Sequence, residues 1–148
     1  MDKSSQLVQS GTDSTPTTFN RADIHMHTNL GDVWASPARV IQEATSRKLT
    51  LIAVTDHDHL EGAKRVEELL AKQDNPLQLI TGVEVSTRQG HLLGLFVKKA
   101  PKPGRSVEES IDAIKAQGGL VIIPHPLGIL VPSLSRKKID ALLEKGYK

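Results

Sequence analysis

Residues 49–58 read LTLIAVTDHD, and this stretch decides the fold class. The apolar part, LTLIAVT, is rich in β-branched side chains, a pattern typical of a strand whose two faces are both covered in a parallel sheet. The ionisable residues that follow, Asp56, His57 and Asp58, are costly to bury at the end of such a strand unless they are paired or bind a metal ion. Alternatively, Asp56 or Asp58 caps the next helix, and Asp58 is the better candidate for this role. The stretch therefore predicts an α/β domain with polar chemistry at a strand end.

Strand and helix patterns alternate on both sides of this stretch. Besides 49–55, apolar runs predict strands over 22–28, 77–86, 91–99 and 119–126. Amphipathic patterns predict helices that begin at Ser36-Pro37, at residue 60, at Ser106 and at Ser135. The loop TRQG is short enough for the strands on either side of it to pair as a hairpin. The alternation indicates a mostly parallel sheet or a barrel, with the functional residues at the carboxyl ends of the strands.

Composition narrows the function classes. The chain has 148 residues, enough for one domain, and 3% aromatic residues disfavour base-stacking surfaces for single-stranded nucleic acid. A net charge of +2 is too small to indicate a nucleic-acid or membrane partner, and the lack of cysteine excludes disulfides and thiolate metal sites. No apolar run is long enough to span a membrane, so we expect a cytoplasmic protein. Residues 1–20 are Ser/Thr-rich and predict a disordered tail before a domain over 21–148.

Five of the six histidines lie close to the ends of predicted strands. His25 and His27 stand two residues apart, which places both imidazoles on one face of a strand, where they can bind one ion. Such a pair is also common by chance on a surface. His91 begins a strand, and His125 follows one, between two prolines, where a purely structural role is the alternative.

The carboxylates point to the same end of the sheet. Glu84 lies between two valines, and a buried acid of this kind needs a metal ion or an arginine such as Arg88 as its partner. We favour the metal, because His91 follows seven residues later. Asp32, five residues after His27, is either a further ligand or an exposed turn residue. Nitrogen and oxygen donors without sulfur suit Zn, Mn or Fe, and their number suggests a multi-metal centre that generates hydroxide and binds phosphoryl oxygens.

In order along the chain, HMHT, Asp32, AVTDHD, GVEVS, GHLLGL and PHP resemble the motifs of the PHP (polymerase and histidinol phosphatase) domain family. The resemblance runs from about Arg21 to at least Pro126 and is strongest to the small stand-alone phosphoesterases of the family. It implies a distorted, seven-stranded β/α barrel that binds up to three divalent metal ions. It also implies hydrolysis of phosphate esters, with a small phosphomonoester, a nucleotide or a short oligonucleotide as substrate.

The same resemblance implies a role for each site residue. His25, His27 and Glu84 would bind a first ion, and Glu84 would bridge to a second ion held by His91 and His125. Asp32 and His57 would bind a third ion, and Asp56 would orient a ligand. Glu84 and Asp56 are the residues expected to take part in catalysis, Glu84 as the bridging ligand and Asp56 by orienting a ligand.

The chain also departs from the family pattern. Family members carry a later Asp-x-His pair, but no histidine follows His125 here, and only five strands are predicted where the fold has seven. We therefore expect the N-terminal part of a PHP domain, or one completed by a second chain. Two alternative functions remain open: a non-catalytic metal-binding or regulatory module, and a metallohydrolase of C–N or carboxylic ester bonds.

Overall fold

The structure is a computed structural model that describes residues 20–31 and 34–147. Its elements are, in chain order, β1 (Ala22–Met26), α1 (Pro37–Ser46), β2 (Leu51–Val54), α2 (Glu61–Leu70), β3 (Gln78–Thr87), β4 (Gly90–Leu95), α3 (Val107–Lys115), β5 (Leu120–Ile122) and α4 (Arg136–Glu144). Asp32 and residues 1–19 of the expected tail lie outside the described residues. In the described ranges, none of the helices could cross a membrane. The cytoplasmic location stays a prediction.

The strands form one sheet in the order β1-β2-β3-β4-β5. The first three strands are parallel, whereas β4 is antiparallel to both β3 and β5. The hairpin of β3 and β4 is therefore confirmed, and the expected parallel pairing holds only for β1 to β3. The connection from Thr87 to Gly90 explains the difference, because a parallel crossover needs about a dozen residues or more.

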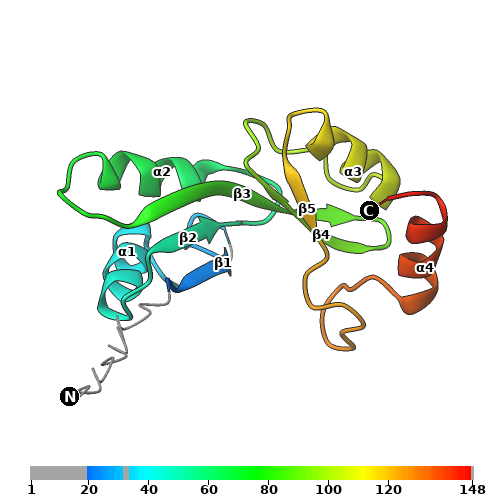
Figure 1. The fold of residues 1–148 in the computed structure, drawn as a ribbon, viewed down its shortest axis with the longest axis horizontal. Helices are drawn as coiled ribbons and strands as arrows, with labels where there is room; N and C mark the ends of the chain where they lie inside the picture. Colours follow the sequence, from blue (N-terminus) through cyan, green and yellow to red (C-terminus); the bar gives the residue numbers. More distant parts are fainter. Residues whose placement is uncertain (1–19, 32–33, 148) are drawn as a thin grey trace, which may run out of the picture.

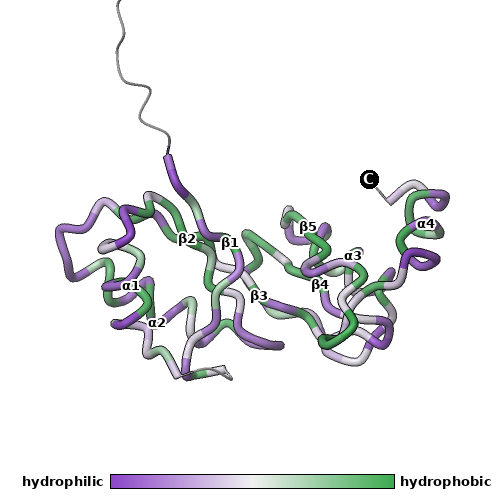
Figure 2. The backbone as a smooth tube through the Cα atoms, turned by 90° about the horizontal axis from the view of Figure 1, so that it is seen from below, coloured by the Kyte–Doolittle hydropathy of each residue, from purple (hydrophilic) through white to green (hydrophobic). Residues whose placement is uncertain are grey.

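Figure 1 shows two groups of elements joined by the long strand β3. On one side lie β1 and β2 with helices α1 and α2, and on the other lie β4 and β5 with α3 and α4. The curled five-stranded sheet confirms the α/β class and is consistent with an incomplete barrel of the kind the sequence predicts. Hydrophilic and hydrophobic residues alternate along α1 and α2 in Figure 2, as expected for helices that cover one face of a sheet.

The two faces of the sheet have different roles. Val83 and Val85 pack on the helix side, in a cluster with Leu60 and Ile114. The opposite face carries a smaller apolar cluster of Ala53, Ile80, Leu93 and Leu95. Because strand residues alternate between faces, Glu84 shares the face of Ile80, and His91 shares the face of Leu93. The sheet thus directs these two side chains away from the helices and toward the same space.

The ends of the elements follow local chemistry. Ser36, Ser106 and Ser135 accept hydrogen bonds from backbone N–H groups in the first turns of α1, α3 and α4, as predicted. Several strands are shorter than their apolar runs: β4 ends at Leu95 because Phe96 has a φ of 61°, which interrupts an extended chain. β5 ends at Ile122, shortly before Pro124, which cannot donate to a strand ladder.

Candidate metal centre

Glu84 is the centre of the site. Its side chain is only 2% exposed, although it is a carboxylate in an otherwise apolar strand. Five imidazole nitrogens surround its two oxygens at 2.8–3.6 Å, and they belong to His25, His27, His57, His91 and His125. Residues on or shortly after each of the five strands therefore converge on one buried acid.

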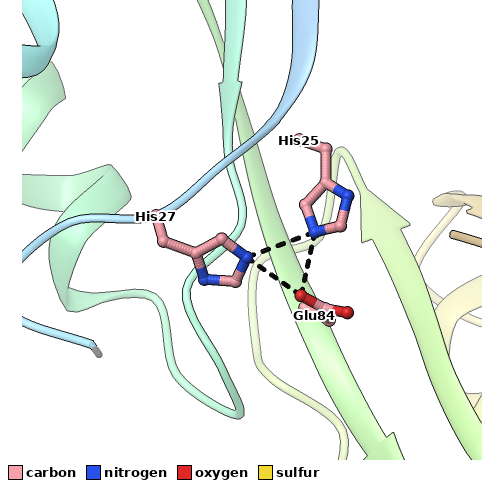
Figure 3. A group of neighbouring side chains, drawn as sticks. All are labelled: His25, His27 and Glu84. Atoms are coloured by element: carbon pink, nitrogen blue, oxygen red, sulfur yellow. Dashed lines mark hydrogen bonds and ion pairs between the residues drawn. The ribbon is translucent and has the colours of Figure 1, made fainter. Parts of the chain in front are cut away.

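His25 and His27 come from β1 and the residue after it, and Figure 3 shows both rings pointing toward Glu84. Each Nε2 atom lies 2.9 Å from Glu84 Oε2, and the two Nε2 atoms are 3.2 Å apart. Two nitrogens and one carboxylate oxygen so close together can be ligands of a single ion. The two-residue spacing in the sequence thus does place both imidazoles on one face.

His91 and His125 lie at the other carboxylate oxygen. His91 Nδ1 is 2.8 Å and His125 Nε2 is 3.0 Å from Glu84 Oε1. His91 is the second residue of β4. Because β4 is antiparallel to β3, the beginning of β4 lies beside the end of β3, and His91 pairs there with Ser86. His125 follows β5 and has a φ of 31°, a conformation that few residues other than glycine adopt.

The segment after β2 places His57. His57 forms a bridge beside Glu84, and the N–H of Asp58 donates to the carbonyl oxygen of Glu84 at 3.0 Å. The carboxylate of Asp58 accepts the N–H of Ser86 at 2.7 Å, so Asp58 joins β2 to β3. The interpretation of Asp58 as a helix cap is wrong, because α2 begins after Leu60 without a side-chain cap.

Asp56 lies deeper, and its side chain is 1% exposed. Its two oxygens accept hydrogen bonds from the N–H and the hydroxyl of Thr28, the residue directly after His27. The sequence motifs alone do not reveal this contact, since Thr28 and Asp56 are 28 residues apart. Asp56 therefore fixes the segment that carries His27.

Other sequence predictions have separate outcomes. Arg88, the alternative partner for Glu84, instead lies 3.5 Å from the carboxylate of Glu109. His59 lies 2.8 Å from Glu61 at the start of α2 and is not one of the histidines around Glu84. Asp32 is outside the described residues, so its role as a ligand stays a prediction.

The donor set fits a divalent metal. The described residues include two groups of three donors, and within each group the donor atoms lie within 4.8 Å of one another. One group is His25, His27 and Glu84, and the other is His57, Glu84 and His91. The second group differs from the set expected from the family resemblance, which has His125 in place of His57. Burial alone would raise the pKa of Glu84, but hydrogen bonds with His25, His27 and His125 outweigh burial and hold the pKa well below its usual range. The carboxylate is therefore ionised and able to bind a cation.

The donors line an open cavity of about 390 Å³. Its described lining consists of Glu84, the five histidines around it, Val131 and Pro132. Val131 and Pro132 lie between β5 and α4, outside the sequence motifs of the site. Ser133 follows them and contacts His125 Nδ1 at 3.0 Å. A serine in a loop carries no distinctive pattern, so only the folded structure reveals it.

Comparison with known proteins agrees with this geometry. The family model of the PHP domain matches residues 23–140, and the chain belongs to the PHP domain family. A two-domain protein from Bacteroides vulgatus, described as containing a predicted PHP-like metal-dependent phosphoesterase, has a similar fold, with a TM-score of 0.70 and 21% identity over 86% of this chain and 42% of that chain.

Three sequence relatives extend the comparison. An uncharacterized protein of Methanocaldococcus jannaschii is 30% identical over 84% of this chain and 78% of its own length. A 5'-3' exoribonuclease of Haemophilus influenzae is 35% identical over 54% of this chain and 30% of that protein. A 3',5'-nucleoside bisphosphate phosphatase of Chromobacterium violaceum is 34% identical over 53% of this chain and 28% of that protein. The chain thus spans less than a third of either named enzyme.

Proposed function

We propose that this protein is a metal-dependent phosphoesterase that hydrolyses a small phosphomonoester, a nucleotide or a short oligonucleotide. One observation carries the proposal: five imidazoles converge on the buried carboxylate of Glu84. The exoribonuclease and the bisphosphate phosphatase among its relatives support a phosphate ester as the substrate.

The charge of the cavity also supports metal dependence. Among the described residues that line it, none is lysine or arginine. A phosphate group would therefore find little positive charge in the side chains alone, whereas divalent ions neutralise phosphoryl oxygens and activate a water molecule when bound. Nitrogen and oxygen donors suit Zn, Mn or Fe. We propose that the site binds up to three such ions and that Asp32 is one further ligand.

The residues of the chain have distinct parts in this proposal. His25 and His27 would hold one ion with Glu84 Oε2, and His91 and His125 would hold a second with Glu84 Oε1. His57 lies 3.6 Å from Oε2, and its donor atom lies within 4.8 Å of those of Glu84 and His91. Asp56 keeps His27 in place through Thr28 rather than touching the substrate.

The test measures metal content and hydrolysis together. We expect the protein to retain zinc or manganese, by plasma emission spectroscopy, and to hydrolyse p-nitrophenyl phosphate or a 3',5'-nucleoside bisphosphate. Glu84→Gln should lower both metal content and rate, the rate by about 100-fold or more. Glu67→Gln, on the exposed side of α2, is the matched control and should change neither. Metal-loaded protein that hydrolyses none of these substrates would contradict the proposal.

A further inference from the structure

Ser133 connects the loop after β5 to His125. The hydroxyl of Ser133 donates to the carbonyl oxygen of Val131 at 3.0 Å. A carbonyl oxygen can only accept, so this bond uses the single hydrogen of the hydroxyl. The contact of 3.0 Å between Ser133 Oγ and His125 Nδ1 must then have the imidazole as its donor.

The direction of this contact decides which nitrogen of a neutral His125 carries the hydrogen. With a hydrogen on Nδ1, the Nε2 atom of a neutral imidazole has its lone pair free for a ligand. Nε2 is the atom that lies 3.0 Å from Glu84 Oε1, in the space shared with His91. We propose that Ser133 is a positioning residue that holds the hydrogen of His125 on Nδ1 and so presents Nε2 as a metal ligand.

The loop around Ser133 is built to keep the hydroxyl in place. Leu134, the next residue, is fully buried and packs with Leu92 and Ile111. One residue earlier, the carbonyl oxygen of Pro132 accepts the N–H of His91 at 3.1 Å. Consecutive residues of one loop thus hold two neighbouring imidazoles of the site and are tied to the core.

Two glycines allow the loop to approach this closely. A Cβ atom on Gly90 would lie 2.6 Å from the carbonyl carbon of Ser133, and Gly90 has a φ of 140°, which side-chain residues rarely adopt. A Cβ atom on Gly128 would lie 2.6 Å from Ser133 Oγ. Gly128→Ala should therefore displace the hydroxyl without removing it, which gives a second way to test the contact.

The proposal rests on the metal centre proposed above, and the variants are chosen to separate the two. Zinc affinity, measured by calorimetric titration, should fall about 10- to 100-fold in Ser133→Ala, the range found when a hydrogen-bond partner of a ligating histidine is lost. Gly128→Ala should also weaken binding, and Ser133→Thr, which keeps a hydroxyl, should bind more tightly than Ser133→Ala. Ser135→Ala is the control: it removes the N-cap of α4, so it should lower stability but not zinc affinity.

Nitrogen NMR of His125 gives a second readout that does not depend on activity. In the zinc-loaded protein, the nitrogen shifts of the wild type should report a hydrogen on Nδ1 and a metal-bound Nε2, and Ser133→Ala should lose this pattern. Failure of the wild type to bind zinc would overturn the metal centre. Unchanged shifts and unchanged zinc affinity in Ser133→Ala would overturn the role of Ser133 while the metal centre stands, as would an equal loss of affinity in Ser135→Ala.

Discussion

Thr28 donates two hydrogen bonds to Asp56, one from its backbone N–H to Oδ1 and one from its hydroxyl to Oδ2, the latter at 2.7 Å. Both residues are buried, so no water replaces these bonds when one partner changes. Because Thr28 directly follows His27, the pair determines where that imidazole lies.

Asp56→Asn should therefore act on stability and on metal binding together. An amide would turn its NH₂ group toward one of the two donors of Thr28, leaving that donor unsatisfied, at a cost of about 1–3 kcal/mol in the free energy of unfolding. We expect a lower midpoint in urea unfolding and a weaker zinc affinity. Asp74→Asn, at an exposed position, is the control and should leave both values unchanged.

Gly62→Ala should destabilise the protein although alanine favours helices. A Cβ atom at position 62 would lie 1.8 Å from Asp56 Oδ2 and 2.5 Å from Thr28 Oγ1. Helix propensity favours alanine by about 1 kcal/mol, but overpacking at a buried site costs typically about 1–3 kcal/mol, and here the clash is severe. Thermal unfolding measures the difference. Lys64→Ala, on the exposed side of the same helix, should shift stability by less than about 0.5 kcal/mol, and a stabilised Gly62→Ala would contradict the observed contact.

His57 and His59 form a matched pair, because they are two residues apart and only His57 lies beside Glu84. His57→Ala should lower zinc or manganese affinity and the rate of phosphate release by about 10-fold or more. His59→Ala should keep both, since its imidazole pairs with Glu61 instead. Equal losses of metal affinity and rate in the two variants would contradict a specific role for His57 as a ligand.

The contact between α3 and α4 should depend on pH. Lys138 and Lys145 hydrogen-bond the carboxylate of Glu108 and lower its pKa from 4.5 to about 2. A lowered pKa in the folded state stabilises the protein above the unfolded pKa, and this contribution is lost as the pH falls from about 4.5 through about 2. The difference in stability between wild type and Glu108→Gln should therefore shrink over that range. We expect it to be on the order of 1 kcal/mol at neutral pH, because the pair is near the surface.

Much of the site was predictable from spacing. The two-residue separation of His25 and His27 fixes a shared face, and a glutamate between valines in β3 must have a partner. These inferences need only the geometry of a strand and the cost of burying a charge. For the same reason, the position of His91 follows once the loop before it is short enough for a hairpin.

Other features depend on contacts between distant segments. The sequence alone left Asp58 as a helix cap, but folding brings its carboxylate to the N–H of Ser86, 28 residues away. The sequence also predicted strands that are longer than the observed ones. The apolar run 119–126, for example, continues past Ile122, the last residue of β5, into the segment that carries Pro124. The loop with Ser133 has no periodicity and no turn signature that would connect it to His125.

The position of Glu84 within β3 has a mechanical consequence. His25 and His27 belong to the parallel half of the sheet, whereas His91 and His125 belong to the antiparallel half, and β3 is the seam between them. The two halves cannot slide or tilt against each other along that seam without separating the two pairs of imidazoles. A cation bound by imidazoles from both halves would cross-link them. Metal affinity and the rigidity of the sheet would therefore increase or decrease together.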